Sequence, residues 1–351
     1  MMQPKNLLIV RTDRIGDVIL SLPVARIVKK YFPQCKVTFL LKEYTNCLAL
    51  QNPYIDQVIV LKEKNGKILF KENIKEILKY KFDSSIIVYP TFITALIIFF
   101  SNIKSRIGTG YRWYSFLFNK KVYEHRKFAE KHELEFNISM LKVFGINEEV
   151  NQENIEFNLA PTVESKNSIE KFFAEENISV EKPIVIIHPG SGGSAVDWPI
   201  DNFQKLVKLI SSQTDLTIII TGNSNEISIC KQLEVTSEIK NFSGKFSLSE
   251  LIALIDKCDI FISNSTGPLH IAAALGKYVI GFYPKITSCL PQRWGPYTKR
   301  KFIFTPQINC SNCTKKQCKE LDCMSSIKPE EVFNQLKKAY QLILNNGEID
   351  V

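Results

Sequence analysis

The sequence predicts an α/β protein with two doubly wound parallel sheets, each in its own domain. At 351 residues the chain is too long for one ordinary domain and fits two of about 150 residues each. Apolar residues make up 45% of the chain and charged residues 23%, which is globular composition with material for two cores. Short apolar runs alternate with amphipathic stretches, a pattern typical of parallel strands joined by crossover helices.

The two halves of the chain repeat this alternation. In the first half we expect strand 6–11, polar loop 12–17, helix 18–31, strands 37–41 and 54–60, a Lys- and Glu-rich helix ending near 81, a strand-like piece at 106–108 and helix 131–144. In the second half we expect strand 184–187, helix 200–212, strand 216–221, a helix capped by Ser247 and Glu250, strand 260–262 and helix 269–275 closed by Gly276. We therefore expect domains at 1–160 and 183–327, a charged linker with one amphipathic helix at 161–182, and a C-terminal helix and tail at 328–351.

One segment has the length and composition of a membrane span. Residues 84–103 contain no charged side chain. Pro90 lies near the centre, and Ser, Thr and Asn interrupt the run. The interpretation we favour divides it into a buried strand at 86–89, a turn and a helix at 92–100. A helix that dips into a membrane is the alternative.

Positive charge is concentrated in the N-terminal half. Residues 1–160 hold 24 Lys and Arg against 16 Asp and Glu, whereas residues 161–351 hold 21 against 20. The excess suggests that the first half faces an acidic partner, such as a phosphorylated acceptor or an anionic lipid surface. A solvated Lys-rich surface is the common alternative. Nucleic acid is not favoured, because the Lys residues are scattered and have few aromatic neighbours.

The stretch 259–276 predicts an anion site. A short apolar strand runs into hydroxyl and amide side chains, and an Ala-rich helix follows. A helix start offers unpaired N–H groups and the positive end of a dipole, so we expect phosphate binding at Thr266, Gly267 and Pro268. His270, in the first turn, would touch a phosphate or sugar, or would only satisfy a backbone carbonyl. An ordinary turn that binds nothing fits the local pattern about as well.

Two further loops at predicted strand ends supply similar groups. The loop after strand 184–187 offers backbone N–H groups and two hydroxyls from four residues, Ser191, Gly192, Gly193 and Ser194. Glu226 follows the next strand and is placed to accept hydrogen bonds from ribose hydroxyls. Taken singly, the loop could equally be a flexible connector, and Glu226 an isolated surface residue without a function. Because the carboxyl ends of parallel strands converge, three such loops together indicate one ligand site.

The familiar nucleotide motifs are absent from the sequence. No G-x-G-x-x-G follows the first strand, and no G-x-x-x-x-G-K-[ST] occurs. There is also no Asp-x-Asp pair to hold a metal–nucleotide complex. A Rossmann dehydrogenase and a P-loop NTPase are therefore disfavoured. Any bound diphosphate must be neutralised by helix ends, hydroxyls and basic side chains.

The first loop holds two carboxylates, Asp13 and Asp17. Asp17 follows Gly16 where the loop becomes a helix, so helix capping is the common interpretation. General-base catalysis from a cleft is the other. The polarity of the loop does not choose between the two carboxylates.

Four of the nine cysteines form a cluster, namely Cys310, Cys313, Cys318 and Cys323. The spacing is compatible with a structural zinc site, although it is not a familiar C-x2-C…C-x2-C arrangement. We expect no signal peptide, and hence no disulfides of the secreted kind. We interpret the cluster as structural, through reduced thiols, a local disulfide or a metal.

Together these segments resemble glycosyltransferase family 9, the ADP-heptose:lipopolysaccharide heptosyltransferases with the GT-B fold. The matching segments are LLIVRTDRIGDVILSLPVARIVKKYFP at 7–33, RIG at 106–108, KHELE at 131–135, IVIIHPGSGG at 184–193, DWP at 197–199, SLSELIALIDKCDIFISNSTGPLHIAAALG at 247–276 and WGP at 294–296. They extend over almost the whole chain. The pairing of R-x-D-R-I-G-D with S-T-G-P-L-H-x-A-A-A-L-G is the most specific part.

The resemblance implies two Rossmann-like domains facing a cleft, the first binding the acceptor and the second the nucleotide sugar, with the final helix crossing back to the first domain. It implies inverting transfer of heptose from ADP-heptose to a phosphorylated glycolipid, the inner core of lipopolysaccharide, without metal or other cofactor. Such an enzyme would be cytoplasmic and peripheral at the inner membrane. The proposed base is Asp17, with Asp13 and Arg14 on the acceptor side. The leaving diphosphate would be held by Ser191, Ser194, Thr266 and Gly267.

Two departures from the family pattern leave the donor open. Many relatives have Lys or Arg directly before the Trp-Pro pair, where this chain has Val196 and Asp197. Many also have Asp where this chain has Ser265. Three basic residues are candidates to compensate at the diphosphate: Lys245, Lys285 and Arg14. The open alternatives are a transferase with a different sugar nucleotide or a protein hydroxyl acceptor, and a non-catalytic nucleotide-sugar-binding protein.

Overall fold

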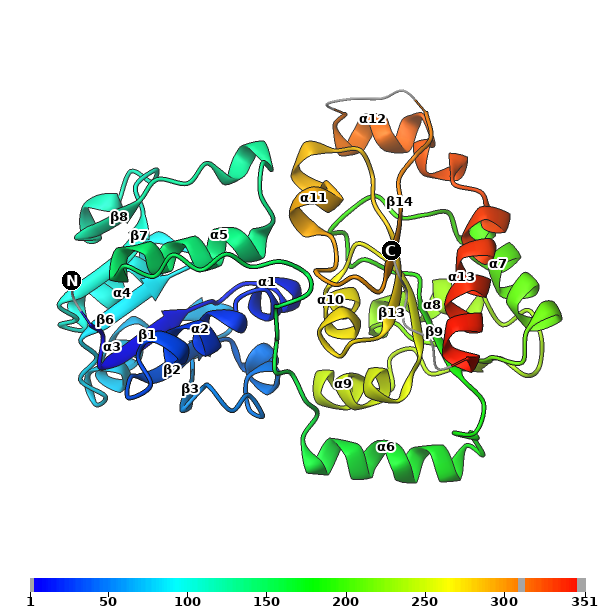
Figure 1. Cartoon of the computed structure of the whole chain (residues 1–351), viewed down its shortest axis with the longest axis horizontal. Helices are drawn as coiled ribbons and strands as arrows, with labels where there is room; N and C mark the ends of the chain where they lie inside the picture. The colour runs from blue at the N-terminus through cyan, green and yellow to red at the C-terminus, as the bar shows by residue number, and fades with distance from the viewer. Residues whose placement is uncertain (1–2, 309–312, 346–351) are drawn as a thin grey trace. The chain divides into compact units, whose positions relative to one another are not determined.

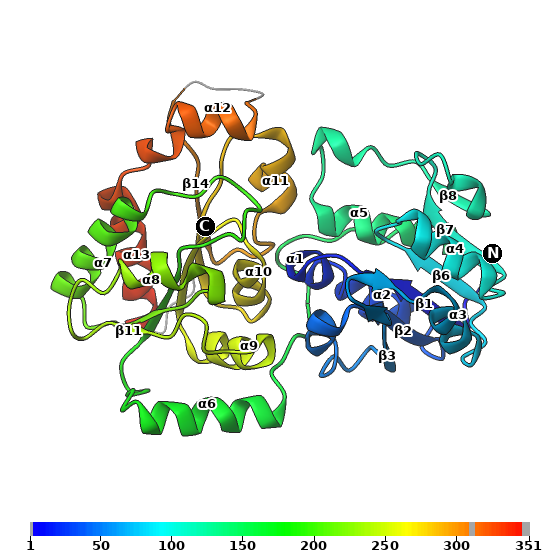
Figure 2. The same cartoon turned by 180° about the vertical axis from the view of Figure 1, so that it is seen from behind.

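A computed structural model describes residues 3–308 and 313–345 and divides the chain into two compact units (Figures 1 and 2). The first unit holds the chain up to Arg126 together with Glu133–Leu159, and the second holds Lys127–His132 and the chain from Ala160 onward. Within the described residues, each unit contains one six-stranded sheet with parallel pairing throughout. The predicted pair of Rossmann-like sheets is confirmed.

The first sheet has the strand order β3-β2-β1-β6-β7-β8. Its strands are β1 Asn6–Val10, β2 Lys36–Leu41, β3 Gln57–Val60, β6 Ser84–Ile87, β7 Ser105–Thr109 and β8 Lys120–Val122, and a small antiparallel pair, β4 Glu63–Lys64 and β5 Lys67–Ile68, lies outside it. Its helices are α1 Ile15–Ile19, α2 Pro23–Tyr31, α3 Phe70–Leu78, α4 Phe92–Phe100 and α5 Glu133–Ser139. The winding reverses between β1 and β6, so the loop after β1 lies at the switch point, where open α/β sheets bind ligands.

Two predicted helices of this unit are each divided. The helix expected at 18–31 is two, because Pro23 has no N–H to donate and instead begins α2 at its first position. The helix expected at 131–144 is α5 followed by a 3₁₀ turn, Met140–Phe144, which ends at Gly145 in the left-handed conformation (φ 81°). The short edge strand β8 was not predicted, since its lysines give no apolar run.

The uncharged segment 84–103 forms a strand and a helix, as we expected. β6 is completely buried, and Thr91 then caps α4 by accepting a hydrogen bond from the Thr94 N–H at 3.2 Å. α4 begins and ends at the predicted residues. Among the described residues, no helix combines the length and the apolar character needed to cross a bilayer.

The second sheet has the order β11-β10-β9-β12-β13-β14. Its strands are β9 Ile184–His188, β10 Thr217–Ile220, β11 Lys240–Asn241, β12 Ile260–Asn264, β13 Tyr278–Phe282 and β14 Lys301–Phe304. Its helices are α6 Val163–Glu175, α7 Ile200–Gln213, α8 Ile227–Lys231, α9 Leu248–Lys257, α10 Gly267–Ala274, α11 Pro291–Trp294, α12 Lys315–Glu320 and α13 Pro329–Leu344. The predicted capping box of α9 is present, and Gly276 closes α10 with a positive φ of 74°.

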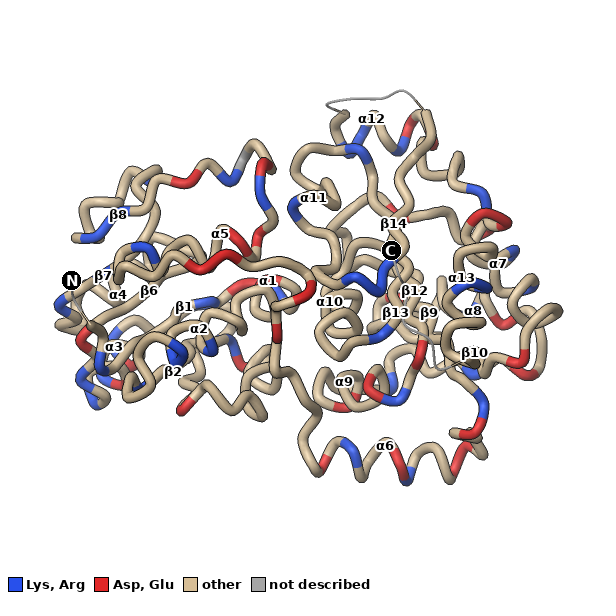
Figure 3. The backbone as a smooth tube through the Cα atoms, in the orientation of Figure 1, with Lys and Arg blue, Asp and Glu red and all other residues tan. Residues whose placement is uncertain are grey.

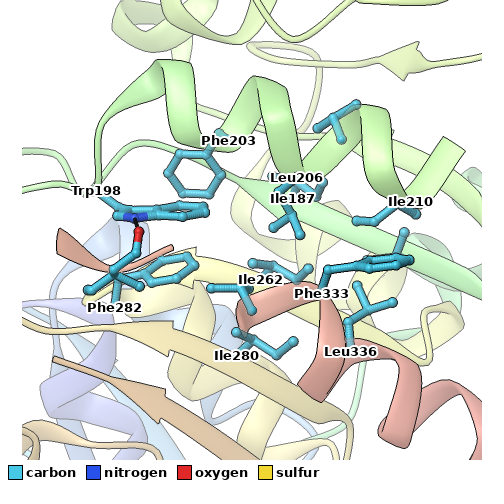
Figure 4. Packing of buried hydrophobic residues seen from close by; sticks show 14 of the residues in the cluster. Ile187, Trp198, Phe203, Leu206, Ile210, Ile262, Ile280, Phe282, Phe333 and Leu336 are labelled. Atoms are coloured by element: carbon cyan, nitrogen blue, oxygen red, sulfur yellow. Dashed lines mark hydrogen bonds between the residues drawn. The ribbon is translucent and has the colours of Figure 1, made fainter. Parts of the chain in front are cut away.

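The final helix, which the family resemblance leads us to expect crossing back toward the first unit, belongs to the second unit and packs in its core. Phe333 and Leu336 of α13 lie in the buried core of the second unit with residues of α7 and the sheet, as Figure 4 shows. α7 and α13 cover one side of this sheet and α9 and α10 the other (Figure 1). The apolar stripe of α13 is therefore satisfied inside one unit. The stretch expected to be a linker contains α6, which packs against α9.

Candidate active site

A buried arginine organises the loop that follows β1. Arg11 is 1% exposed, and its backbone N–H continues the ladder to β2 by donating to the Leu40 carbonyl at 3.1 Å. Its Nη2 donates to Asp17 Oδ1 at 2.5 Å, and its Nε lies 2.9 Å from Asp13 Oδ1 in an ion pair without hydrogen-bond geometry. Glu133 Oε1 is 3.5 Å from Nη2. Burial opposes the guanidinium charge, but the three carboxylates outweigh it and raise the pKa of Arg11.

A second layer of side chains holds this cluster from α5. Glu133, the first residue of that helix, is buried and also forms an ion pair with Arg126. Arg126 Nη1 lies 3.3 Å from Asn137 Oδ1, to which it donates. The Asn137 amide donates in turn to the Leu20 carbonyl at 3.0 Å, which ties α5 to the turn after α1. The position of Asp17 is thus fixed by residues far apart in the sequence.

The two carboxylates of the loop differ in their surroundings. The Asp17 side chain is 16% exposed and that of Asp13 is 11% exposed. Burial, reinforced by the charge of Asp17 and opposed by Arg11, raises the pKa of Asp13 to about 7. The capping interpretation of Asp17 is wrong, because the N-cap of α1 is Arg14 and the Asp17 carboxylate pairs with Arg11.

In the second unit, Asn264 joins the loops that follow the two central strands. It ends β12, which lies beside β9 at the switch point of the sheet. Its amide donates to the Pro189 carbonyl at 2.5 Å, and its Oδ1 accepts from the Trp198 N–H at 2.8 Å. Asn264 is completely buried, so both bonds are shielded from water. The loop 188–198 is therefore fixed against the end of β12.

Glu226 joins the loops after β9 and β10. Its carboxylate accepts from the Gly192 N–H at 3.1 Å and from the Asn223 N–H at 2.8 Å. The imidazole of His188 lies 3.7 Å from the same carboxylate and 3.0 Å from the Thr221 hydroxyl. Burial lowers the pKa of His188, although Glu226 acts in the opposite direction. The predicted loops thus meet, with Glu226 holding backbone groups of two of them.

Glycines allow the loop after β9 to pack against Glu226, in one case by leaving space and in two others by adopting a positive φ. A Cβ on Gly190 would lie 1.9 Å from Glu226 Oε1, so only glycine leaves room for the carboxylate. Gly192 and Gly193 have φ values of +57° and +77°, the left-handed region that glycine adopts without strain.

A basic side chain reaches this loop from α12. Lys315 Nζ donates to the carbonyls of Gly193 at 3.0 Å and Ser194 at 3.1 Å. The Ser194 hydroxyl donates to the Ser191 carbonyl, which tightens the same turn. Lys315 therefore brings its positive charge into direct hydrogen-bond contact with the loop 191–194.

The start of α10 has the features of an anion site. Thr266 is the N-cap, has extended backbone, and makes no side-chain cap bond. The first N–H groups of a helix have no intrahelical partner, and Pro268 has none to offer, so those available in the first turn belong to Gly267 and Leu269. His270 is buried, and its Nδ1 has no hydrogen-bond partner among the described residues. Burial lowers the pKa of His270 to about 4, so the imidazole is neutral.

Two of the basic residues suggested as compensating cations, Lys245 and Lys285, contact other groups. Lys245 Nζ is 3.5 Å from Glu176 and lies over the ring of Phe242 at 5.0 Å. Lys285 donates to the Ile308 carbonyl at 3.1 Å. Arg14 is exposed and belongs to the first unit. No hydrogen bond or ion pair of the described residues joins Lys245 or Lys285 to the loops at the switch point of the second sheet.

The cysteine cluster is only partly described, since Cys310 lies outside the described residues. Cys318 and Cys323 are buried in the apolar core of the second unit, and Cys313 packs against it. No group of three or more His, Cys, Asp or Glu side chains in the described part of the chain is arranged to hold a metal ion.

The residues of these clusters that were not among the predicted site residues include Arg11, Glu133, Asn264 and Lys315. Three of these four lie inside motifs that the resemblance had already singled out, R-x-D-R-I-G-D, K-H-E-L-E and S-N-S-T-G. An arginine placed directly after a buried strand was the available signal for Arg11, because burying its charge requires acidic partners. Nothing in the local sequence of Lys315 connects it to residues 193–194.

The comparisons with known proteins agree with this architecture. Residues 71–324 match the model of glycosyltransferase family 9 (heptosyltransferase). The chain is 30% identical to a protein of Haemophilus influenzae named provisionally as a glycosyltransferase, over 83% of this chain and 86% of that one. It is 26% identical to the lipopolysaccharide core heptosyltransferase OpsX of the same organism, over 95% and 97% of the two chains.

A solved structure shows the same fold. Escherichia coli ADP-heptose lipopolysaccharide heptosyltransferase II superposes with a TM-score of 0.76 at 17% identity, covering 97% of this chain and 100% of that one. Because the family model matches more than half of the chain, and a relative at 30% identity covers most of it, the chain is a glycosyltransferase with the GT-B fold and belongs to glycosyltransferase family 9, the heptosyltransferases.

Proposed function

We propose that this protein transfers a heptose from ADP-heptose to a phosphorylated glycolipid acceptor in the inner core of lipopolysaccharide, with inversion at the anomeric carbon and without a metal ion. The first unit would bind the acceptor, with Asp13 and Arg14 beside it, and the second unit would bind the donor. Both the family and the name of the relative OpsX support this substrate class.

The observation that carries the proposal is that Asp17 is both held by Arg11 and accessible to solvent. Its carboxylate is oriented by Arg11 at 2.5 Å and is more exposed than the two neighbouring carboxylates, Asp13 and Glu133. A base must be held in one place and still reach a substrate proton. Asp17 meets both conditions at the switch point of the first sheet.

In the proposed step, Asp17 removes the proton from an acceptor hydroxyl as that oxygen forms a bond to the anomeric carbon of the donor. The bond between this carbon and the diphosphate oxygen breaks, and ADP leaves with the electron pair. Arg11 would keep the Asp17 carboxylate oriented during the transfer.

On the donor side, the leaving diphosphate would be held by backbone N–H groups and hydroxyls. The groups concerned belong to the loop 191–194 and to the start of α10, at Thr266 and Gly267. His270 is neutral and would offer its imidazole as a hydrogen-bond partner without charge. Glu226 would accept bonds from the ribose, which requires only the lone pairs that its two backbone contacts leave unused. Lys315 would supply the positive charge at the diphosphate, in place of the Lys or Arg that many relatives have directly before Trp198.

Asp13 is the second candidate for the base, because a pKa near 7 suits proton transfer at neutral pH. Two isosteric variants, Asp17→Asn and Asp13→Asn, separate the candidates. We expect Asp17→Asn to lower kcat by about 10²–10⁴-fold while ADP affinity stays unchanged, and Asp13→Asn to have a much smaller effect. The measurement is transfer to isolated lipopolysaccharide acceptor, followed by mass spectrometry, with ADP binding followed by calorimetry.

The reverse order of the two effects assigns the base to Asp13. Unchanged turnover in both variants removes the proposed mechanism. Failure of the wild-type protein to use ADP-heptose, with transfer from another sugar nucleotide or to a protein hydroxyl, identifies the related transferase. Donor binding without hydrolysis or transfer identifies a non-catalytic binding protein.

We also infer a cytoplasmic location at the inner membrane, since the acceptor is a membrane glycolipid, and a structural role for the cysteine cluster. Metal analysis of the purified protein distinguishes zinc from reduced thiols at Cys310, Cys313, Cys318 and Cys323. No nucleic acid takes part.

A further inference from the structure

A forty-residue segment of the first unit combines positive charge with aromatic side chains. Residues 84–123 contain no Asp or Glu, five Lys or Arg and ten Phe, Tyr or Trp. The segment covers β6, α4, β7 and β8, half of the first sheet. Neither the proposed base nor the donor site draws any residue from it.

Many of these aromatic side chains are exposed, where a globular protein usually buries them. Trp113 is 72% exposed, Phe116 67% and Phe100 55%. Phe92 and Phe99, on the same helix as Phe100, are about 40% exposed. We call these five residues the aromatic surface. An exposed apolar group of this size on one unit marks an interaction site.

The aromatic surface is held together by contacts within the unit. The rings of Phe92 and Trp113 are 4.7 Å apart, which joins α4 to the loop after β7. The Arg106 guanidinium lies 5.0 Å from the Phe99 ring, and its Nε donates to the Leu117 carbonyl at 2.9 Å. The loop is therefore fixed on α4 at two places.

Four exposed basic residues accompany the aromatic surface: Lys104, Arg112, Lys120 and Lys121. Lys120 and Lys121 lie on β8, the edge strand, and Lys104 is joined to the start of β8 because Asn119 donates to its carbonyl at 2.6 Å. Among the described residues none of the four forms an ion pair, unlike Lys29, Lys30 and Lys62 of the same unit. Figure 3 shows basic residues and no acidic ones along the tube of β8. These four positive charges are therefore available to bind an anionic partner.

We propose that the aromatic surface and its four basic residues bind the face of an anionic phospholipid bilayer. The aromatic rings would enter the interface between headgroups and acyl chains, which Trp and Phe favour, and the lysines would contact lipid phosphates. A bilayer fits better than a protein partner, because the rings and cations are spread over a helix, a loop and an edge strand without any acidic residue. This inference deepens the proposed function by assigning its membrane contact to named residues.

The first test is binding of the full-length protein to vesicles. We expect co-sedimentation with vesicles of phosphatidylethanolamine and phosphatidylglycerol, weakened by salt, and little binding to phosphatidylcholine alone. Of the three tryptophans, Trp198 is buried and Trp113 exposed, so insertion should shift the fluorescence of Trp113 to the blue. The Trp113→Phe variant should bind and lose that shift.

Two double variants test the residues themselves. Trp113→Ser with Phe116→Ser should weaken vesicle binding by roughly tenfold or more. Lys120→Gln with Lys121→Gln should weaken it by roughly thirtyfold and reduce the salt dependence. The matched controls lie in the second unit: Val180→Ser with Leu321→Ser, which are 67% and 66% exposed, and Lys205→Gln with Lys208→Gln on α7. The controls should bind as wild type does.

Three results overturn the inference: no binding to anionic vesicles, equal binding by the variants and their controls, or a dimer in light scattering that the aromatic variants dissociate. The last assigns the surface to a second copy of the chain. Circular dichroism and ADP binding show that each variant is folded. Asp17→Asn should bind vesicles normally but not transfer, whereas the surface variants should still transfer to a delipidated acceptor. Failure of the membrane contact and failure of the catalytic proposal are therefore distinguishable.

Discussion

Arg11 is the residue on which the acidic cluster of the first unit depends. It is buried with Asp13, Asp17 and Glu133 around it, and Glu133 also pairs with a second cation, Arg126. Removing one member of a buried ionic group leaves charge without compensation, which costs more than the group contributes as a whole. The arginine is therefore a structural requirement for placing the proposed base.

We expect Arg11→Met to destabilise the first unit by about 3–5 kcal/mol, because two aspartates would lose their cation. The matched variant is Arg26→Gln, which breaks the exposed pair of Arg26 with Glu156 at 2.8 Å and should cost less than about 1 kcal/mol. Calorimetric unfolding of both variants makes the comparison. Equal destabilisation by the two variants would show that water compensates the aspartates when Arg11 is removed.

Asp13 should make stability depend on pH. Its pKa of about 7 in the folded protein is above the ordinary value near 4, so between these values the folded state keeps a proton that the unfolded state has lost. The stabilisation is present at low pH and is lost as the pH rises toward 7. The melting temperature of Asp13→Asn relative to wild type should therefore increase from about pH 5 to about pH 8.

The control for this prediction is Asp56→Asn. The pKa of Asp56 is lowered, despite some burial, by hydrogen bonds from Lys29 and the Val37 N–H, so its carboxylate is ionised throughout that range. Its difference from wild type should stay constant. A constant difference for Asp13→Asn as well contradicts the raised pKa.

At the scale of elements, the second unit positions its loops by side chains that bridge strand ends. Glu226 and Asn264 each hold backbone groups of a loop other than their own. The loops therefore have a defined shape before any donor binds, which lowers the entropic cost of binding. Gly190 is essential to this, because its missing Cβ makes room for Glu226.

We expect Gly190→Ala to weaken ADP binding by about tenfold, because the displaced Glu226 carboxylate loses its bonds to Gly192 and Asn223. Gly192→Ala is the comparison: a Cβ there meets no atom within 4 Å, but the φ of +57° costs about 1 kcal/mol of stability. Calorimetry gives the affinities and thermal melts the stabilities. Equal affinities in both variants show that Glu226 does not shape the donor site.

At the scale of the whole molecule, the described residues form two units, each with a buried apolar core. α13 adds Phe333 and Leu336 to the second core, so this helix stabilises the proposed donor unit. Ligands of one unit should then affect the unfolding of that unit more than the other.

We expect ADP at about 100 times its Kd to stabilise the second unit by about 2.7 kcal/mol and the first unit hardly at all. Trp198 is stacked on Phe282 in the second core and reports on that unit by fluorescence. EDTA should change neither the stabilisation of the second unit by ADP nor the transfer rate. A loss of either on chelation indicates that a metal takes part.

The sequence by itself determined the α/β class, the division into two sheets, most strands and the family. These follow from periodicity and short motifs, which are local: α4 begins and ends at the predicted residues, and Ser247 caps α9 as expected. Only the tertiary structure decided which charges meet. Arg11 pairs with Glu133, and Lys315 donates a hydrogen bond to the loop at 193–194; each contact joins residues more than a hundred positions apart. The helix α13 packs on α7 in its own unit. Such pairings depend on how strands are ordered in a sheet and on which apolar faces remain uncovered, and no local pattern encodes either.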